Sequence, residues 1–150
     1  MKLGWIHVAG PAELRREALD RLEWIADAYL PVSAPVMHAA PRWLELAPGI
    51  QAPLMERAAT NLAQLDAALG PQSAWRRLPA QGGWVALVEA PRIHSEEEWV
   101  LEWLEQYHVL AQPGYFYDFE REAFLALSLL PRPEDFATAL RRLAGVFGPV

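Results

Sequence analysis

Imine chemistry depends on a lysine amine, and the chain has one lysine, Lys2, beside twelve arginines. Arginine cannot form an imine at neutral pH, so any Schiff base in this chain would have to form on Lys2. The histidines match no metal-ligand spacing, and the sequence has no GxSxG elbow for a nucleophilic serine and no glycine-rich phosphate loop. We therefore predict no metal site, and we expect the four histidines to be structural or solvent-facing. They are His7, His38, His94 and His108.

Aromatic residues fill four of the five positions from Tyr115 to Phe119, directly after the turn at Pro113–Gly114. Such a run is bulky for a surface loop, and two interpretations stay open. The loop either folds back onto the core or forms the rim of an apolar pocket in which the phenols of Tyr115 and Tyr117 orient a ligand. Ser33 is a weaker candidate for a functional residue. It stands just before a helical segment, and its hydroxyl is more simply explained as the cap of that helix.

These candidate residues belong to a chain of 150 residues, a length typical of one domain. The net charge of −6 argues against the basic surface that binding to nucleic acid or to anionic lipid needs. With 53% hydrophobic residues the chain can bury a core, and without cysteine it has neither disulfides nor thiolate metal sites. The sequence shows no apolar run of membrane-spanning length and no signal sequence, so we expect a soluble, cytoplasmic protein with no membrane partner.

The first half of the chain is predicted to be a short strand followed by helices. The helices are recognised by apolar positions at helical spacing, and they are expected to end where prolines or a Gly-Pro pair follow. The expected elements are a strand over residues 3–8, a helix over 13–30, a helical segment over 36–46 interrupted by Pro35 and Pro41, and a helix over 53–69.

The second half of the chain has the pattern of a βαββα lobe. Ser95 and Glu98 have the spacing of a capping box, so a helix is predicted over 96–107 with an acidic first turn. Trp99 and Trp103, one helical turn apart, are expected in the core rather than on a stacking surface. The other expected elements are an extended piece over 75–79, a turn at 81–83, strands over 84–89 and 109–111, a fully buried strand over 124–130, and a last helix that begins at Pro133 and turns Phe136, Leu140, Leu143 and Phe147 inward.

Six segments share their order and spacing with one known family: Lys2–Ile6, Tyr29–Pro35, Gly82–Val88, Ser95–Glu98, Val109–Phe119 and Leu127–Leu130. Together they resemble the C-terminal part of the class I/II, fold-type-I, pyridoxal-phosphate (PLP) aminotransferases, and most of all the alanine-aminotransferase-like branch. The resemblance is collinear and covers essentially the whole chain. It implies an α+β (α/β two-layer) fold, in which long N-terminal helices precede a small, mainly antiparallel sheet covered by helices.

The resemblance implies that the chain is one part of an enzyme. Residues 1–30 correspond to the end of the large-domain sheet and the interdomain helix, and residues 31–150 to the small domain. The Schiff-base lysine of the family would fall before Met1, whereas Lys2 matches the residue that holds the cofactor phosphate, with Ser33 as a second candidate. The chain alone would then bind PLP weakly or not at all and catalyse nothing. Its partners would be a large PLP-binding domain, a second copy in a homodimer, and an amino acid substrate.

The resemblance also indicates which residues would face the substrate. The loop that carries Tyr115 and Tyr117 would form part of the substrate-side wall. Many members of the family have an arginine near the last strand that pairs with the substrate α-carboxylate, but Ala126 stands at that position here. Arg121 would take over this role if its loop reaches the pocket, and otherwise it is a surface arginine.

Three functions follow from these observations as hypotheses. The first is the C-terminal domain of a PLP-dependent aminotransferase, which moves an amino group between an amino acid and a 2-oxo acid. The second is a non-catalytic, standalone partner-binding module derived from an aminotransferase. The third is an autonomous α+β domain that binds a small ligand and is unrelated to the family. A reading frame that continues upstream through a Ser-x-x-Lys segment favours the first, and a true start codon at Met1 favours the second.

Overall fold

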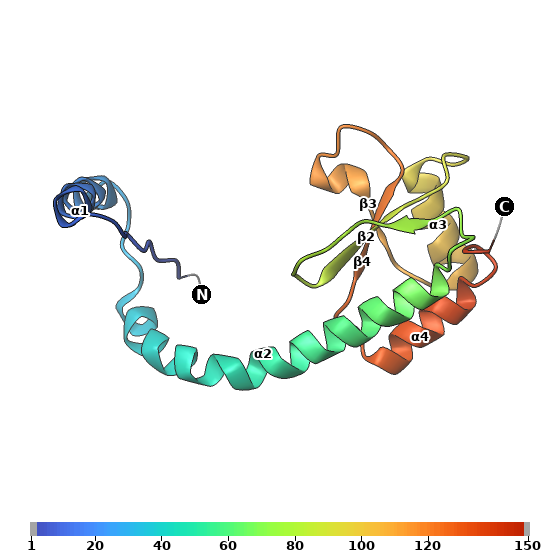
Figure 1. Cartoon of the computed structure of the whole chain (residues 1–150), viewed down its shortest axis with the longest axis horizontal. Helices are drawn as coiled ribbons and strands as arrows, with labels where there is room; N and C mark the ends of the chain where they lie inside the picture. Colours follow the sequence, from blue (N-terminus) through green and yellow to red (C-terminus); the bar gives the residue numbers. More distant parts are fainter. Residues whose placement is uncertain (1–2, 149–150) are drawn as a thin grey trace. The chain divides into compact units, whose positions relative to one another are not determined.

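The computed structural model describes residues 3–148. The chain divides into two compact units between Ile50 and Gln51. Within the described range the elements follow in this order (Figure 1): α1 (Ala12–Asp27), α2 (Ala34–Ala68), β1 (Arg76–Arg77), β2 (Val85–Glu89), α3 (Glu96–Tyr107), β3 (Gln112–Pro113), the 3₁₀ helix η1 (Gly114–Tyr117), β4 (Phe124–Ser128) and α4 (Pro133–Arg142).

Helix α1 of the first unit confirms the helix predicted over 13–30, although it ends at Asp27, three residues earlier. None of its 16 residues is buried. Its apolar side chains, among them Leu14, Trp24 and Ile25, are exposed. Because a helix of this length is marginal in water without tertiary packing, this apolar surface is the kind that another part of a protein covers.

The strand predicted over residues 3–8 is wrong, because these residues have no regular secondary structure. Trp5 is 71% exposed and Ile6 is 73% exposed. An extended segment becomes a strand only when a neighbouring strand pairs with its backbone, and in the described chain the sheet is made from the second unit alone.

Helix α2 crosses the boundary between the two units without a break, so the prediction of two separate helical segments is wrong. Pro35 lies in the first turn, where its missing N–H would have no partner within the helix anyway. Pro41, Pro48 and Pro53 each remove one i→i−4 hydrogen bond, yet the helical assignment runs through all three. A proline more often bends a helix than ends it when the flanking turns are good helix formers.

The second unit contains a four-stranded sheet with strand order β1–β2–β4–β3, in which all neighbouring strands are antiparallel. In the middle of the register, Ala126 of β4 lies opposite both Leu87 of β2 and Gln112 of β3. Strands β1, β2 and β4 lie within the segments predicted to be extended. The α+β fold class predicted from the sequence is therefore confirmed.

The strand predicted over 109–111 is displaced to β3. His108, directly after α3, has a left-handed backbone with φ 54°. The N–H of Val109 still donates to the carbonyl of Trp103 (3.0 Å), so this residue belongs to the end of the helix. Pairing with β4 therefore begins only at Gln112.

Helix α3 begins and ends where the sequence predicts, at Glu96 and Tyr107. The predicted capping box is present: the Glu98 N–H donates to the Ser95 hydroxyl (3.2 Å), and the Ser95 N–H donates to the Glu98 carboxylate (2.7 Å). These bonds satisfy two of the backbone N–H groups that a helix N-terminus leaves without partners.

Successive residues of a strand point to opposite faces, which gives this sheet a covered face and an open face. Along β2, Ala86 and Val88 are fully buried, whereas Val85, Leu87 and Glu89 are only half-buried. The covered face packs against the C-terminal half of α2 and against α3 and α4 (Figure 1). The core between them includes Leu65, Leu69, Trp99, Trp103, Leu125, Leu127, Phe136, Leu140, Leu143 and Phe147, which confirms the inward positions predicted for the last helix.

Three tryptophans occupy the centre of this core. The ring centroid of Trp75 lies 4.8 Å from that of Trp99 and 5.2 Å from that of Trp103, and Phe147 packs edge-on against Trp103 at 5.6 Å. The indole N–H of Trp75 donates to the carbonyl of Val146 (3.0 Å). Trp99 and Trp103 are thus core residues, as predicted. Helix and sheet are held together by these large buried side chains, each of which contributes about 1.5–3 kcal/mol through burial.

Candidate functional site

The open face of the sheet carries the residues that the sequence singles out. Because paired residues of neighbouring strands share a face, Leu87, Gln112 and Ala126 lie on the open face with Val85 and Ser128. No described helix contributes to the core on this side of the sheet. The open face is therefore the surface on which side chains of this unit can meet a ligand or another domain.

A pocket of about 320 Å³ lies at one end of the open face. We call it the β4 pocket. It is lined by Ala126 and Ser128 of β4, by Tyr117 of η1 and by Trp84, which precedes β2. Val85, Leu110, Ala111, Gln112 and Leu130 complete the lining.

The aromatic run after the Pro-Gly turn splits into two parts. The side chains of Tyr115, Phe116 and Tyr117 are exposed, so the interpretation of a loop folded back onto the core does not hold for them. Phe119 turns inward and packs on Phe124, with ring centroids 4.6 Å apart. Tyr117 lines the β4 pocket, and its hydroxyl donates to the side-chain carbonyl of Gln112. Tyr115 instead packs edge-on against Phe116 and is not among the pocket residues.

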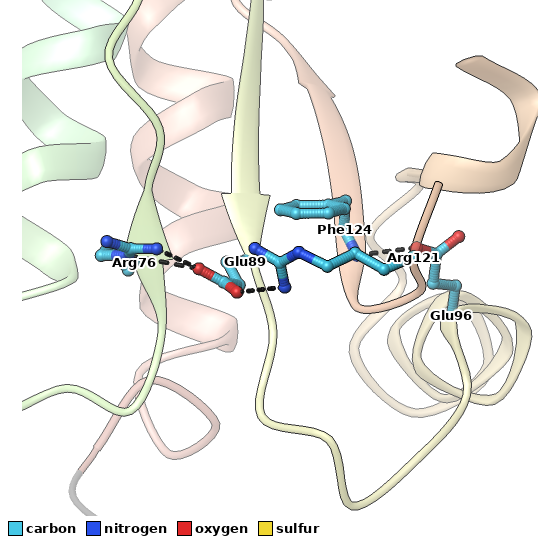
Figure 2. A network of polar contacts seen from close by, with 5 residues as sticks. All are labelled: Arg76, Glu89, Glu96, Arg121 and Phe124. Atoms are coloured by element: carbon cyan, nitrogen blue, oxygen red, sulfur yellow. Dashed lines mark hydrogen bonds and ion pairs between the residues drawn. The ribbon is translucent and has the colours of Figure 1, made fainter. Parts of the chain in front are cut away.

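A charged cluster occupies the other end of the open face (Figure 2). The Glu89 carboxylate accepts from Arg121 Nη1 (2.6 Å) and from Arg76 Nε (3.2 Å). The guanidinium carbon of Arg121 also lies 4.6 Å from the ring centre of Phe124. Hydrogen bonds from Arg76 and then from Arg121 hold the pKa of Glu89 below its ordinary value. Arg121 thus shares a face with Ala126, but its guanidinium is engaged by an internal carboxylate.

The lowered pKa of Glu89 predicts how this cluster depends on pH. A carboxylate with a lowered pKa contributes stability above its ordinary pKa of 4.5, and this contribution is lost as the pH falls through the folded-state pKa. We expect Glu89→Gln to lower the free energy of unfolding by less than about 1 kcal/mol at neutral pH, because both arginines are well exposed. Urea unfolding from neutral pH to below pH 4.5 should show the difference from the unmodified chain shrinking.

The control for this pH experiment is Glu105→Gln, which removes an exposed carboxylate of α3. Its effect should be small at every pH. A Glu89→Gln difference that stays constant into acid would show that the ion pairs with Arg76 and Arg121 contribute nothing.

Glu96, which the sequence suggests is a plain first-turn acid, proves to organise the loop between α3 and β4. It is only 2% exposed. Its two carboxyl oxygens accept from the backbone N–H groups of Tyr115 and Phe124, each at 2.7 Å. Figure 2 shows the bond to Phe124. A Cβ on Gly114 would lie 2.8 Å from Glu96 Oε1 and from the Phe124 carbonyl, so only glycine fits there. No motif marks this role; the one sequence signal is that a glycine precedes the aromatic run.

The remaining predicted site residues lie elsewhere. Lys2 is outside the described residues. Ser33 is exposed in the first unit, directly before α2, and its carbonyl accepts from the N–H groups of Val36 (2.9 Å) and Met37 (3.1 Å). Tyr115, Tyr117 and Arg121 all belong to the second unit.

The histidines and acids give no sign of a metal centre in the described chain. Between residues 3 and 148 no three His, Asp or Glu side chains are grouped so that they could hold an ion. His94 packs edge-on against Trp99, with ring centroids 4.7 Å apart.

None of the helices between residues 3 and 148 has the length and apolar character that crossing a membrane requires.

Comparison with solved structures finds one recurring fold. The aspartate aminotransferase of Thermotoga maritima matches 90% of the chain with a TM-score of 0.65 and 16% identity. The alanine aminotransferase of Pyrococcus furiosus matches 90% with a TM-score of 0.63 and 22% identity. The α-aminoadipate aminotransferase of Thermus thermophilus, solved with N-(5′-phosphopyridoxyl)-L-leucine, matches 87% with a TM-score of 0.61 and 24% identity.

The chain spans only about a third of these larger proteins: 33%, 34% and 35% of their lengths in the same order. No protein-family model matches the sequence, and neither does any curated protein. The likeness therefore shows the fold: the chain has the fold of the C-terminal, small-domain region of fold-type-I PLP aminotransferases.

The described residues do not make a complete site for PLP. An imine with PLP needs a lysine amine, and residues 3–148 contain no lysine. The β4 pocket has no cationic side chain to hold a phosphate. In this part of the chain, the open face and the loop held by Glu96 form a surface but not a complete cofactor site.

Proposed function

We propose that this chain is the C-terminal lobe of a PLP-dependent aminotransferase, which moves an amino group between an amino acid and a 2-oxo acid. The observation that carries the proposal is the fold likeness to aminotransferases, which covers most of this chain but only about a third of theirs. The cofactor and the imine-forming lysine then belong to a large domain, and the chain alone is not catalytic. Lys2 and Ser33 are the candidates for contact with the cofactor phosphate.

The surface of the first unit supports a role beside a larger domain. Helix α1 buries none of its residues, and Trp24, Ile25 and Leu30 are exposed. Apolar side chains gathered on a surface usually mark a contact with another domain or chain. In this proposal they contact the PLP-binding domain, and the complete enzyme is a homodimer.

The open face supports a role at the substrate side of the enzyme. Tyr117 lines the β4 pocket from the loop that Glu96 fixes, and Tyr115 stands exposed two residues before it. Arg121 lies on the same face beside Phe124. To bind a substrate carboxylate it would have to exchange its internal partner, Glu89, for the ligand.

The first test is to titrate the purified chain with PLP, followed by borohydride trapping and peptide mapping. We expect no saturable aldimine absorbance and no more trapped label than in Lys2→Ala, because stoichiometric imine formation needs a lysine in a preorganised cofactor site, and in this proposal that lysine belongs to the large domain. Stoichiometric trapping at Lys2 would instead mean that this residue is the catalytic lysine and that the chain acts without a large domain.

The second test concerns the coding sequence around the chain. We expect a PLP-binding domain with a Ser-x-x-Lys segment to be encoded upstream, and its joint expression with this chain to give transamination that neither part shows alone. If no such domain is encoded, the chain is a standalone partner-binding module, and the proposal is wrong.

A further inference from the structure

None of the described residues that line the β4 pocket is charged, although 21% of the residues in the chain are. Ala126 and Ser128 of β4 are among its lining residues, and of the two only Ser128 is exposed. Its polar groups are those of Ser128, Gln112 and Tyr117, all neutral. The lining therefore favours a ligand group that carries no charge, because a buried charge needs an opposite charge or several hydrogen bonds to offset its lost hydration.

The walls of the pocket suit an apolar or aromatic group. Trp84 is 58% exposed and Leu110 is 74% exposed, and both line the pocket. Exposed apolar side chains around a hollow provide the contact area that most small-molecule sites use. At about 320 Å³ the pocket is near the lower end of the range for small-molecule sites, so it fits a single ring or branched chain.

Arg121, a cation on the open face, does not line this pocket. Arg121 is bonded to Glu89 at 2.6 Å and covers the ring of Phe124, and it lines a different hollow, beside the start of α3. Phe124 and Ser128 are four residues apart along β4, which separates the two ends of the face by roughly 13 Å. Arg57 Nη1 donates to the backbone carbonyl of Leu130 at 3.3 Å, but neither Arg57 nor Arg121 is among the residues that line the β4 pocket, so no described guanidinium lines it.

We propose that the β4 pocket binds an uncharged apolar or aromatic group, and that it takes the side chain of an uncharged amino acid or 2-oxo acid in preference to that of a dicarboxylic one. The second half of this statement rests on the proposed function, whereas the first half rests on the pocket alone. Tyr117 and Gln112 give the bound group one hydrogen-bonding edge, and Trp84 and Leu110 give it apolar walls.

The experiment compares two probes that share a phenyl ring and differ in charge, 3-phenylpropionamide and 3-phenylpropionate. Each is titrated into the isotope-labelled full chain without PLP, and amide and indole resonances are followed by NMR. We expect the amide to shift the resonances of Trp84, Gln112 and Ser128, and the carboxylate to bind at least about fivefold more weakly because no cation replaces its water. Shifts at other sites, or equal binding of both probes, would overturn the proposal.

A charge placed in the pocket should weaken this preference. Ser128 is exposed and lines the pocket, so Ser128→Arg adds a guanidinium there without disturbing the core. We expect it to bind 3-phenylpropionate about threefold more tightly than the unmodified chain does, which is the size of a solvent-exposed ion pair. The matched control is Gln106→Arg, which adds the same charge on the exposed surface of α3 and should leave both affinities unchanged. An amide-over-carboxylate preference of unchanged size in a folded Ser128→Arg chain would place the binding elsewhere and overturn the proposal.

The outcome is separable from that of the proposed function. Probe binding uses neither PLP nor a large domain, so it succeeds or fails whether or not the chain belongs to an aminotransferase. If the amide binds in the pocket but no PLP-binding domain is encoded, the ligand preference stands and the assignment to an amino acid side chain falls.

Discussion

Replacing Glu96 with alanine is expected to lower the free energy of unfolding of the full chain by about 3 kcal/mol or more, measured by urea unfolding. The side chain is buried, and it accepts from the N–H groups of Tyr115 and Phe124 at 2.7 Å each. Alanine would leave both donors inside the protein without a partner, and each such donor costs about 1–3 kcal/mol. The loop between Gly114 and β4 should lose its fixed position, which hydrogen exchange at Phe124 would report.

The matched control for the Glu96 experiment is Glu97→Ala. It removes the neighbouring first-turn carboxylate of α3, which is exposed, so we expect a loss of less than about 1 kcal/mol through the helix dipole. Glu96→Gln keeps one acceptor and should fall between the two alanine variants. Equal effects of Glu96→Ala and Glu97→Ala would show that the loop does not depend on the buried carboxylate.

Asn61→Asp is expected to destabilise the second unit by about 3 kcal/mol or more, measured in the same way. Asn61 is fully buried on α2, and its side-chain N–H groups donate to the carbonyls of Leu129 (3.0 Å) and Pro131 (2.8 Å) after β4. A carboxylate of the same shape would set oxygen against oxygen and bury a charge without a cation. Together with the bond from Arg57 to the carbonyl of Leu130, these hydrogen bonds join α2 to the residues that follow β4.

Acid should partly rescue Asn61→Asp, because a protonated carboxyl can again donate one hydrogen bond. The control is Gln51→Glu, the same change from amide to carboxylate at an exposed position of α2. We expect its effect to be within about 0.5 kcal/mol. A comparable loss in both variants would mean that the hydrogen bonds to Leu129 and Pro131 contribute little.

Local signals in the sequence predict much of the second unit. The capping box of Ser95 and Glu98 places α3 at its observed bounds, and the apolar run from Phe124 identifies β4. The inward positions of Phe136 and Leu140 follow from helical spacing. These predictions succeed because each depends on contacts within a few residues or on a periodic pattern that one packed face imposes.

The wrong or missing predictions concern features that depend on residues far away in the sequence. Residues 3–8 have a strand-like composition, but no strand of the described chain pairs with them. The prolines of α2 suggest separate helices, yet the turns between them stay helical. Glu96 looks like a solvent-facing helix start, and its buried role depends on N–H groups 19 and 28 residues further along. Likewise, the sequence does not show that Arg121 forms an ion pair with Glu89, or that Tyr117 and Ala126 line the same pocket.

The way Glu96 holds the aromatic loop has an evolutionary consequence. The carboxylate accepts hydrogen bonds from the backbone N–H groups of Tyr115 and Phe124, and their side chains take no part. Replacing Tyr115, Phe116 or Tyr117 therefore leaves both hydrogen bonds in place. Selection can therefore change what the loop presents to a ligand one mutation at a time, at little cost in stability. Glu96 and Gly114 have no such freedom, since the first supplies the acceptors and the second the space. A lineage that drifts toward new ligands would keep Glu96 and Gly114 and vary residues 115–117.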